Sequence, residues 1–202
     1  VAIFDADFVP PRDFLTRLVP RFADPAVGAV QARIGFLNRH ASLVTVAAAL
    51  MQDVFSHVEQ RGRAAAGVFL SFAGSAGIWR RSAIEDAGGW SYDTLTEDLD
   101  LSFRAQLRGW RIVFEPDVVA DMELPQSFSA FRSQQRRWTT GFIQTALKLG
   151  PALLVLRVPS RTRYAGLIHL TTAASCPLLL ALLLMSAPAF GVHAFFAREP
   201  LW

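Results

Sequence analysis

The sequence predicts an α/β domain, followed by an amphipathic helix that lies on a membrane and a helix that crosses it. Over residues 1–126, short apolar runs that suit strands alternate with longer helical patterns, which is typical of layered α/β architectures. Residues 127–150 form a helical pattern with a basic and aromatic face, and no charged residue occurs from Ala165 to Ala197. We therefore predict an α/β domain at 1–126, an interface helix at 127–150, and a transmembrane helix with the start of a further membrane segment at 164–202.

The predicted strands are short apolar runs bounded by turn residues. In chain order they cover residues 1–4, 27–34, 68–72, 77–80, 110–114 and 118–122. The run 1–4 contains no polar residue, so it suits a strand buried on both faces of a parallel sheet. It ends at Asp5-Ala6-Asp7, and open α/β sheets bind their ligands at such strand ends.

The predicted helices cover residues 12–22, 42–66, 82–87, 96–108 and 127–149. Ser42 is a suitable N-cap for the long second helix, and Gly67 is a suitable stop. Gly109 ends the fourth helix. Gly150-Pro151 is expected to end the last one, because proline cannot continue a helix without loss of a backbone hydrogen bond.

Charge is distributed unevenly along the chain, whose formal net charge is +3. No acidic residue occurs between Glu123 and Glu199, although this stretch carries many arginines and Lys148, which is the only lysine. A basic second part suits acidic lipid, a phosphate-bearing substrate or nucleic acid. Because the basic residues do not interleave with aromatic residues in a nucleic-acid motif, we expect no nucleic-acid partner.

Residues 164–186 predict a transmembrane helix. The chain is 52% hydrophobic and 18% charged, which is apolar for a soluble domain. The stretch meets the roughly 20 apolar residues that a helix needs to cross a bilayer, and Pro177 is tolerated in it as a kink. The alternative is a buried helix of a soluble protein, which the length of the run disfavours. The positive-inside rule places the start of the stretch in the cytoplasm, because three basic residues precede it: Arg157, Arg161 and Arg163.

Asp5 and Asp7 are candidate ligands for a divalent cation. Two carboxylates one residue apart at a strand end can hold a hard cation together with a diphosphate. A solvated turn is one alternative, since the pattern is common by chance. Another is a phosphatase of the haloacid-dehalogenase type, with Asp5 as nucleophile, Asp7 as acid and base, Val9 completing the pattern, and the acids at 97–100 binding metal. That family also needs a catalytic lysine, for which the chain offers no good candidate.

Thr96-Glu97-Asp98 lies at the predicted start of a helix. Transfer of a group to a hydroxyl needs a base that takes the hydroxyl proton, and a carboxylate can do this when its surroundings raise its pKa toward neutrality. Glu97 and Asp100 would raise the pKa of Asp98, whereas the helix N-terminus would lower it. Acidic residues that only favour the first turn of a helix are the alternative.

Gln134, Arg137 and Trp138 are spaced i, i+3 and i+4, so they share one face of the predicted helix. That face offers an amide, a guanidinium that can bind a diphosphate and an indole that can stack on a sugar ring. The alternative is a helix that lies on a membrane, with arginines toward the headgroups and tryptophan at the interface. Arg132 and Arg136 suit that second role.

Two further features are candidate ligand contacts. Phe72, Gly74 and Ser75 belong to a turn of small residues, in which glycine lets the backbone approach a ligand closely. A plain hairpin is the alternative. Trp90 follows two glycines ahead of the acidic residues, where it can stack on a sugar or pack in the core.

Taken together, these motifs occur in a characteristic order: Asp5-x-Asp7, Phe72-Ala-Gly-Ser75, Gly88-Gly-Trp90, Thr96-Glu-Asp98 and Gln134-x-x-Arg137-Trp138. Basic residues and an apolar helix follow. Over nearly the whole chain this series resembles the processive family 2 glycosyltransferases, the cellulose-synthase-like group. Residues 72–138 are most similar to the bacterial relatives of β-mannan and glucomannan synthases. Asp-x-Asp is unspecific, but Gln-x-x-Arg-Trp at this distance after Thr-Glu-Asp is characteristic.

The resemblance implies the C-terminal part of a GT-A (Rossmann-like) glycosyltransferase domain that performs inverting, single-displacement transfer. Asp7, helped by Asp5, would hold Mg²⁺ or Mn²⁺ on the diphosphate of a nucleotide-sugar donor, either UDP-glucose or GDP-mannose. Asp98 would be the general base, with Glu97 beside it.

For the binding residues, the resemblance implies that Gln134 and Arg137 contact the donor diphosphate or the glycan acceptor. Trp138 would stack under the terminal sugar of the acceptor. Residues 72–75 would line the acceptor site.

The resemblance also implies a multi-pass protein of the plasma (inner) membrane, in contact with the lipid bilayer, whose catalytic domain is cytoplasmic. Family members carry an earlier half-domain that grips the nucleotide base. We expect that half to be missing here, and the 202-residue chain to be inactive alone. A non-catalytic membrane module is a third possibility.

Overall fold

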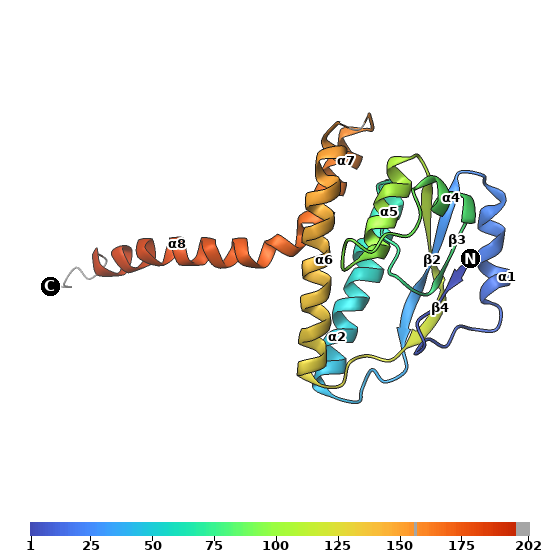
Figure 1. Cartoon of the computed structure of the whole chain (residues 1–202). Helices are drawn as coiled ribbons and strands as arrows, with labels where there is room; N and C mark the ends of the chain where they lie inside the picture. Colours follow the sequence, from blue (N-terminus) through green and yellow to red (C-terminus); the bar gives the residue numbers. More distant parts are fainter. Residues whose placement is uncertain (156, 197–202) are drawn as a thin grey trace.

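The computed structural model describes residues 1–155 and 157–196 and is built on a four-stranded mixed sheet (Figure 1). The strands lie in the order β1-β3-β2-β4. β3 is antiparallel to both of its neighbours, while the long pair β2 and β4 is parallel. The prediction of an α/β domain is confirmed. The strand bounds are β1 (Ala2–Ile3), β2 (Val27–Phe36), β3 (Gly77–Trp79) and β4 (Arg111–Met122).

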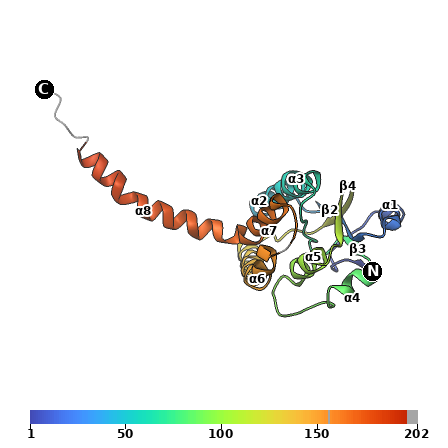
Figure 2. The ribbon, with the colours of Figure 1, turned by 90° about the horizontal axis from the view of Figure 1, so that it is seen from above.

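The helices flank this sheet on both sides (Figures 1 and 2). Helix α1 covers one face, and α4 and α5 cover the other. Neighbouring residues of β2 enter two separate hydrophobic cores, because Val30 packs with α1 whereas Ala29 packs with α4 and α5. The helical bounds are α1 (Phe14–Leu18), η1 (Val19–Ala23), α2 (Leu43–Val54), η2 (Phe55–Gln60), α3 (Arg61–Ala66), α4 (Arg81–Asp86), α5 (Glu97–Leu107), α6 (Phe128–Val155), α7 (Ser160–Thr171), η3 (Thr172–Ala174) and α8 (Ser175–Phe196).

The prediction of a parallel sheet around residues 1–4 is wrong. β1 is antiparallel to β3, with Ala2 opposite Ile78, and Val1 is 62% exposed. An apolar run indicates burial, but the direction of pairing depends on how the partner strand enters the sheet. Here the chain reverses at a turn around Gly74 and brings β3 back between β1 and β2.

The predicted strands 110–114 and 118–122 form a single strand, β4. Its register against β2 shifts between Ala32 and Arg33. Pro116 lies in this irregularity and has no N–H to donate to the ladder, while Nε of Arg33 donates to its carbonyl oxygen at 3.1 Å. The proline therefore interrupts the pairing without ending the strand.

Residues 68–72, predicted as a strand, do not join the sheet. The Leu70 N–H donates to Oε1 of Gln106 at 2.9 Å, and Nε2 of Gln106 donates back to the Leu70 carbonyl at 2.7 Å. The Phe72 N–H donates to Oγ of Ser102 at 2.9 Å. Because side chains of α5 satisfy these backbone groups, the segment needs no partner strand.

The long helix predicted at 42–66 is confirmed as the succession α2, η2 and α3. Ser42 caps it, since its Oγ accepts the Thr45 N–H at 3.1 Å and Oγ1 of Thr45 accepts the Ser42 N–H at 2.9 Å. Gly67 ends it with a φ of +62°. η2 is a π-helical turn, a feature frequent at functional sites.

Helix α6 does not end at Gly150-Pro151, as predicted, but continues to Val155. A proline inside a helix costs about 3 kcal/mol. Leu149 and Leu153 offset this cost, because both are buried in a cluster with Leu170 of α7, and a fully buried leucine contributes about 1.5–3 kcal/mol.

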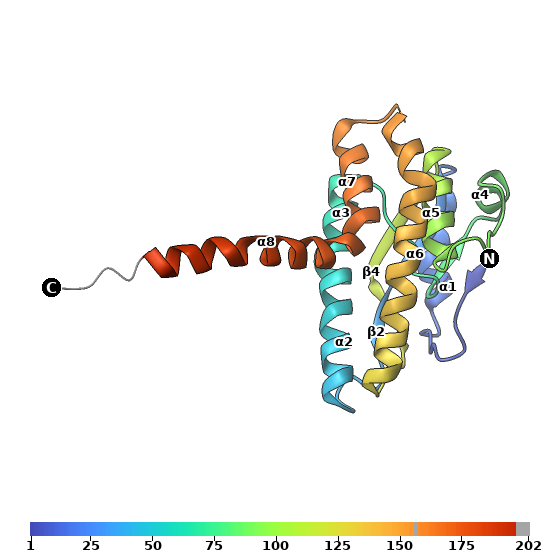
Figure 3. The same ribbon diagram turned by 60° about the vertical axis from the view of Figure 1, so that its left-hand side comes forward.

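The predicted transmembrane stretch 164–186 is divided between helices. The segments Ser160–Ala174 and Pro177–Ser186 meet at a bend of 69°. Across the described residues, no helix taken singly has both the length and the hydropathy to cross a bilayer, whereas this bent pair together meets those requirements. α8 projects away from the rest of the chain (Figures 1 and 3). Residues 197–202 of the predicted membrane segment lie outside the described residues.

Candidate active site

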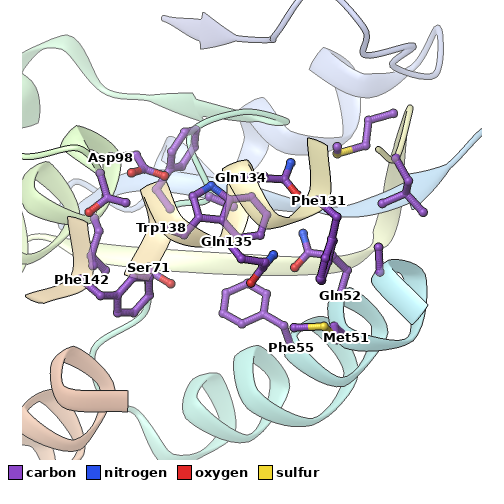
Figure 4. Close-up of a pocket in the computed structure, with 17 residues that line it drawn as sticks. Met51, Gln52, Phe55, Ser71, Asp98, Phe131, Gln134, Gln135, Trp138 and Phe142 are labelled. Atoms are coloured by element: carbon purple, nitrogen blue, oxygen red, sulfur yellow. The ribbon is translucent and has the colours of Figure 1, made fainter. Parts of the chain in front are cut away.

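A cavity of about 250 Å³ lies between α2 and η2 on one side and α6 on the other, next to the N-terminus of α5 (Figure 4). Met51, Gln52 and Phe55 form one wall, facing Phe131 and Trp138 of α6. The wall is rich in aromatic rings and amides, and Asp98 is its only charged side chain among the described residues. Four predicted site residues line the cavity: Phe72, Asp98, Gln134 and Trp138.

Asp98 is the second residue of α5 and is half-buried. Removal from water raises the pKa of its carboxyl to about 7. Hydrogen bonds from the N–H groups of Leu99 and of Asp98 itself oppose the rise, while the negative charges of Glu97 and Asp5 add to it. Burial thus outweighs the start of the helix, and the carboxylate is matched to proton transfer near neutral pH.

Asp5, Asp7, Glu97 and Arg137 lie outside the cavity wall and form one electrostatically coupled group. Burial raises the pKa of Asp5, as do the negative charges of Asp7 and Glu97, whereas the guanidinium of Arg137 lowers it. The structure therefore brings together the end of β1, the start of α5 and the exposed side of α6.

The carboxylates of this group fit a hard divalent cation. Mg²⁺ and Mn²⁺ prefer oxygen ligands that carry negative charge. In the described part of the chain, no group of three or more His, Cys, Asp or Glu side chains could hold a metal ion by itself. Asp5 and Asp7 would therefore need further oxygens from a ligand. A diphosphate supplies such oxygens.

The turn at 72–76 lies between Asp5 and Asp98. Oγ of Ser75 accepts the Asp5 N–H at 2.8 Å, and a Cβ built on Gly74 would lie 3.0 Å from Oδ2 of Asp98. Gln31 is 1% exposed and holds this turn, because its Oε1 accepts the Ala73 N–H at 2.8 Å and its Nε2 donates to the Ser75 carbonyl at 3.0 Å.

Helix α6 is held closely against the start of α5. At Gly141 a Cβ would lie 2.5 Å from Cγ2 of Thr96, so only glycine fits without movement. About two turns further on, Nζ of Lys148 lies 2.8 Å from Oδ1 of the buried Asp100. These contacts fix Trp138 relative to Asp98.

Trp90 lies apart from the other candidates. It is 40% exposed, packs edge-on against Trp79 with ring centroids 6.5 Å apart, and does not line the cavity.

Lys148 is not available as the catalytic lysine of a phosphatase site at Asp5, since it pairs with Asp93 and Asp100.

Sequence reasoning missed four positioning residues: Gln31, Ser102, Gly141 and Lys148. Gly141 had a usable signal, because a glycine inside a helical pattern implies a packing reason. The other three act through buried polar contacts between distant parts of the chain. Such contacts leave no local pattern.

Comparison with known proteins connects this geometry to an enzyme family. The family described as Glycosyl transferase family group 2 matches residues 1–197. A probable glucomannan 4-beta-mannosyltransferase 3 from Oryza sativa subsp. japonica is 43% identical over 155 residues, which are 76% of this chain and 28% of the relative. Glucomannan 4-beta-mannosyltransferase 1 from Cyamopsis tetragonoloba is 46% identical over 142 residues, 70% of this chain and 27% of the relative. The chain thus spans little more than a quarter of the length of these relatives.

A solved structure shares the fold. The mannosyltransferase PcManGT from Pyrobaculum calidifontis, in complex with GDP-Man and Mn²⁺, superposes with a TM-score of 0.62 at 24% identity. The match covers 96% of this chain and 53% of that one. The family match and the relatives give the phosphatase alternative no support.

Proposed function

Because this chain belongs to the glycosyl transferase family group 2, we propose that it contributes the transfer site of a membrane-bound enzyme that adds hexose from a nucleotide sugar to a growing β-glycan. The family match also confirms the resemblance drawn from the motifs. The observation that carries the proposal is the position of Asp98, a carboxylate with a pKa of about 7 in a cavity walled by Gln134 and Trp138.

In this proposal Asp98 is the general base. It takes the proton from a hydroxyl of the acceptor sugar as the hydroxyl oxygen forms a bond to the anomeric carbon of the donor. The bond from that carbon to the diphosphate breaks on the opposite face, so the configuration inverts. The proton ends on Asp98, and the nucleoside diphosphate leaves with the electron pair of the broken bond.

Asp5 and Asp7 are proposed to bind the donor diphosphate through Mg²⁺ or Mn²⁺. The ion, when bound, neutralises the negative charge that develops on the leaving diphosphate. Arg137 lies close enough to Asp5 to lower its pKa, which supports the proposal that its guanidinium contacts the same diphosphate. Glu97 adds negative charge beside both Asp5 and Asp98.

The cavity is proposed to hold the acceptor glycan rather than the donor. No arginine or lysine is among its described wall residues, as a diphosphate would require. Aromatic rings and amides instead suit neutral sugars, because rings stack on sugar faces and amides bind hydroxyl groups. Trp138 and Gln134 supply one of each, and Phe72 and Ala73 add to the wall. Gly74 and Ser75, predicted with them, are not among the lining residues.

We propose GDP-mannose as the donor, with UDP-glucose as the alternative. The support is that the relatives are named as glucomannan 4-beta-mannosyltransferases and that the solved neighbour is a mannosyltransferase in complex with GDP-Man and Mn²⁺. The acceptor would then be a β-mannan or glucomannan chain.

The proposed location is the inner membrane, with the transfer site on the cytoplasmic side. The bent pair of apolar helices supports membrane attachment. The basic residues before and within the first turn of α7 support the orientation: Arg157, Arg161 and Arg163.

The test uses the full-length parent protein in membrane vesicles with Mg²⁺ or Mn²⁺ and radiolabelled GDP-mannose, UDP-glucose or UDP-N-acetylglucosamine. We expect GDP-mannose to label polymer, and Asp98→Asn to lower the rate by about 10²–10⁴-fold. Glu85→Gln is the control, because Glu85 is an exposed partner of Arg81 in α4.

Each other outcome contradicts a different part of the proposal. Label only in lipid would retain the transferase and exclude a polymer product. Release of phosphate from phosphomonoesters without any transfer would favour the phosphatase, and full activity of Asp98→Asn would favour a module whose carboxylates are structural.

A further inference from the structure

One polar contact joins helix α7 to the π-helical turn η2 beside the cavity. Nδ1 of His169 in α7 lies 2.6 Å from Oε1 of Glu59 in η2, although the two residues are 110 positions apart in the sequence. His169 is only 2% exposed, and Glu59 is half-buried. Neither residue belongs to a motif, so the proposed chemistry leaves this pair without a role.

The proton in this contact belongs to His169. Burial alone would raise the pKa of Glu59, but the hydrogen bond from His169 and the positive charge of Arg63 outweigh burial and lower it. A carboxylate can only accept hydrogen bonds, so Nδ1 of His169 is the donor. Nε2 of His169 is buried and has no hydrogen-bond partner in the described part of the chain, which favours the neutral ring. The contact is therefore a charge-assisted hydrogen bond with a fixed direction.

The turn η2 connects this hydrogen bond to the cavity. Phe55 is the first residue of η2 and lines the cavity, as does Ser71 (Figure 4). Gln60 is the last residue of η2 and is 1% exposed, and its Nε2 donates to the Ser71 carbonyl at 2.7 Å. Glu59 precedes Gln60 in the chain. A displacement of η2 at Glu59 would therefore move two parts of the cavity wall.

The ring of His169 reaches the same wall from the other side. It stacks on Phe103 of α5 with ring centroids 5.8 Å apart and an interplanar angle of 10°. It also meets Phe142 of α6 edge-on, with centroids 5.6 Å apart. Phe142 lines the cavity about one helical turn beyond Trp138. The imidazole is thus held between the core of α5 and a ring of the cavity wall.

Arg63 gives α7 a second attachment to the same layer. Its Nη2 donates to the Ala165 carbonyl in α7 at 3.2 Å, and its Nε donates to the Phe69 carbonyl at 2.7 Å. Its positive charge also faces Glu59. Figures 2 and 3 show α3 and α7 side by side. The position of α7 is therefore fixed relative to η2 at two points.

We propose that Glu59 and His169 are positioning residues for the acceptor. Their hydrogen bond holds Phe55, Ser71 and Phe142 at the spacing that the sugar chain requires, so the fit of the acceptor depends on the position of α7. The inference rests on the proposed function, which assigns the cavity to the acceptor glycan. Glu59 and His169 are not themselves lining residues. Loss of their contact should weaken acceptor binding, which raises the KM of the acceptor and leaves kcat unchanged.

The test uses the full-length parent protein in detergent, with GDP-mannose as donor and β-1,4-linked mannohexaose as acceptor. Glu59→Leu removes the hydrogen-bond acceptor, and His169→Phe removes the donor but keeps a ring. Glu59→Gln retains an oxygen that can accept from Nδ1. Glu115→Leu is the matched control, because Glu115 pairs with Arg21 at the same distance of 2.6 Å and lies outside the cavity wall. Calorimetric titration with mannohexaose measures acceptor affinity independently of transfer.

We expect Glu59→Leu and His169→Phe each to raise the KM and Kd of mannohexaose about tenfold, which corresponds to the loss of one hydrogen bond. The kcat and the KM of GDP-mannose should stay unchanged, and Glu59→Gln and Glu115→Leu should retain the acceptor KM. The double variant Glu59→Leu/His169→Phe leaves no polar partner unpaired, so it should recover Tm while its acceptor KM stays raised. It also serves if a single variant does not fold.

Three outcomes would overturn the inference and leave the proposed function intact. One is recovery of the acceptor KM together with Tm in the double variant, because the contact would then only stabilise the fold. Another is a loss in kcat or in donor KM as large as the change in acceptor KM. The third is an unchanged acceptor KM in both single variants. If the unchanged protein neither transfers mannose nor binds mannohexaose, the proposed function fails and this inference fails with it.

Discussion

A Cβ added at Gly74 would lie 3.0 Å from Oδ2 of Asp98, so the turn beside the cavity leaves little room for a side chain next to the carboxylate that we propose as the base. Ser102 strengthens this link, because its Oγ donates to the Asp98 carbonyl at 2.6 Å and accepts the Phe72 N–H at 2.9 Å. The turn and the start of α5 therefore hold one another in place.

Gly74→Ala is expected to lower both stability and kcat. The φ of Gly74 is +79°, a conformation that costs an L-residue roughly 1–2 kcal/mol, and the new methyl group would press on the Asp98 carboxylate. Gly67→Ala is the matched control, because its φ of +62° brings similar strain, while the new methyl group would meet nothing within 4 Å in the described part of the chain beyond its sequence neighbours. Urea unfolding should show comparable losses in both variants, but only Gly74→Ala should lose transfer activity. Equal kcat values for the two would contradict the role of the contact.

Transfer activity is expected to fall as the pH drops below about 7. Asp98 must be deprotonated to accept a proton, and burial raises its pKa to about 7. Below that pH the fraction of active base should decline roughly tenfold per pH unit. Rates in vesicles between about pH 5 and pH 9 would measure this. A profile with no inflection near neutrality would exclude Asp98 as the titrating base.

Asp98→Asn is expected to be less active but more stable than the unchanged protein at alkaline pH. The folded pKa of about 7 lies above the ordinary value of 3.8, so the folded state binds the proton more tightly than the unfolded state does. The stability that this provides is fully present below pH 3.8 and is lost as the pH rises through about 7. Asparagine carries no charge to bury. The difference in Tm between the two proteins should therefore grow over this interval and level off above it, whereas a constant difference would contradict the raised pKa.

Gly141→Ala is expected to separate α6 from the start of α5. The added methyl group would lie 2.5 Å from Cγ2 and 2.7 Å from the backbone nitrogen of Thr96, and such overpacking typically costs about 1–3 kcal/mol. Gly150→Ala serves as the control in the same helix, because its new Cβ would meet no atom within 4 Å among the described residues apart from its own helix backbone and chain neighbours. It should be neutral or stabilising by about 0.5–1 kcal/mol. Thermal unfolding and transfer assays should show a loss of stability and of activity in Gly141→Ala but not in Gly150→Ala. Equal results for the two variants would contradict a role for the close contact at Gly141.

Lys148→Met is expected to destabilise the protein by about 2 kcal/mol, because it removes one partner of a buried carboxylate. Asp100 is completely buried, and Arg104, whose Nε lies 2.7 Å from Oδ2, would remain as its partner. Lys148→Arg keeps the charge and should recover much of the loss in urea unfolding. If Lys148→Met unfolds at the same urea concentration as the unchanged protein, the ion pair contributes nothing to holding α6 on α5.

Local patterns in the sequence were sufficient for several features. Ser42 and Gly67 bound the long helix because capping needs only residues a few positions apart. Gln134 and Trp138 face the same cavity because four residues make about one helical turn. These features depend on neighbours in the chain, so their positions could be predicted without knowledge of the fold.

Other features depended on residues far apart in the sequence. β1 pairs antiparallel with β3, and residues 68–72 bond to side chains of α5 instead of a strand. Trp90, grouped with the site by its motif, packs on Trp79 away from the cavity.

Asp98 shows most clearly which properties follow from the local sequence and which depend on the tertiary structure. The sequence by itself determined that a carboxylate stands at the start of a helix, among other acids, in a chain with the motifs of a glycosyltransferase. It could not determine whether the pKa of that carboxylate rises or falls. Only the tertiary structure decided this, because the largest influence on the pKa is the removal of water by segments distant in sequence.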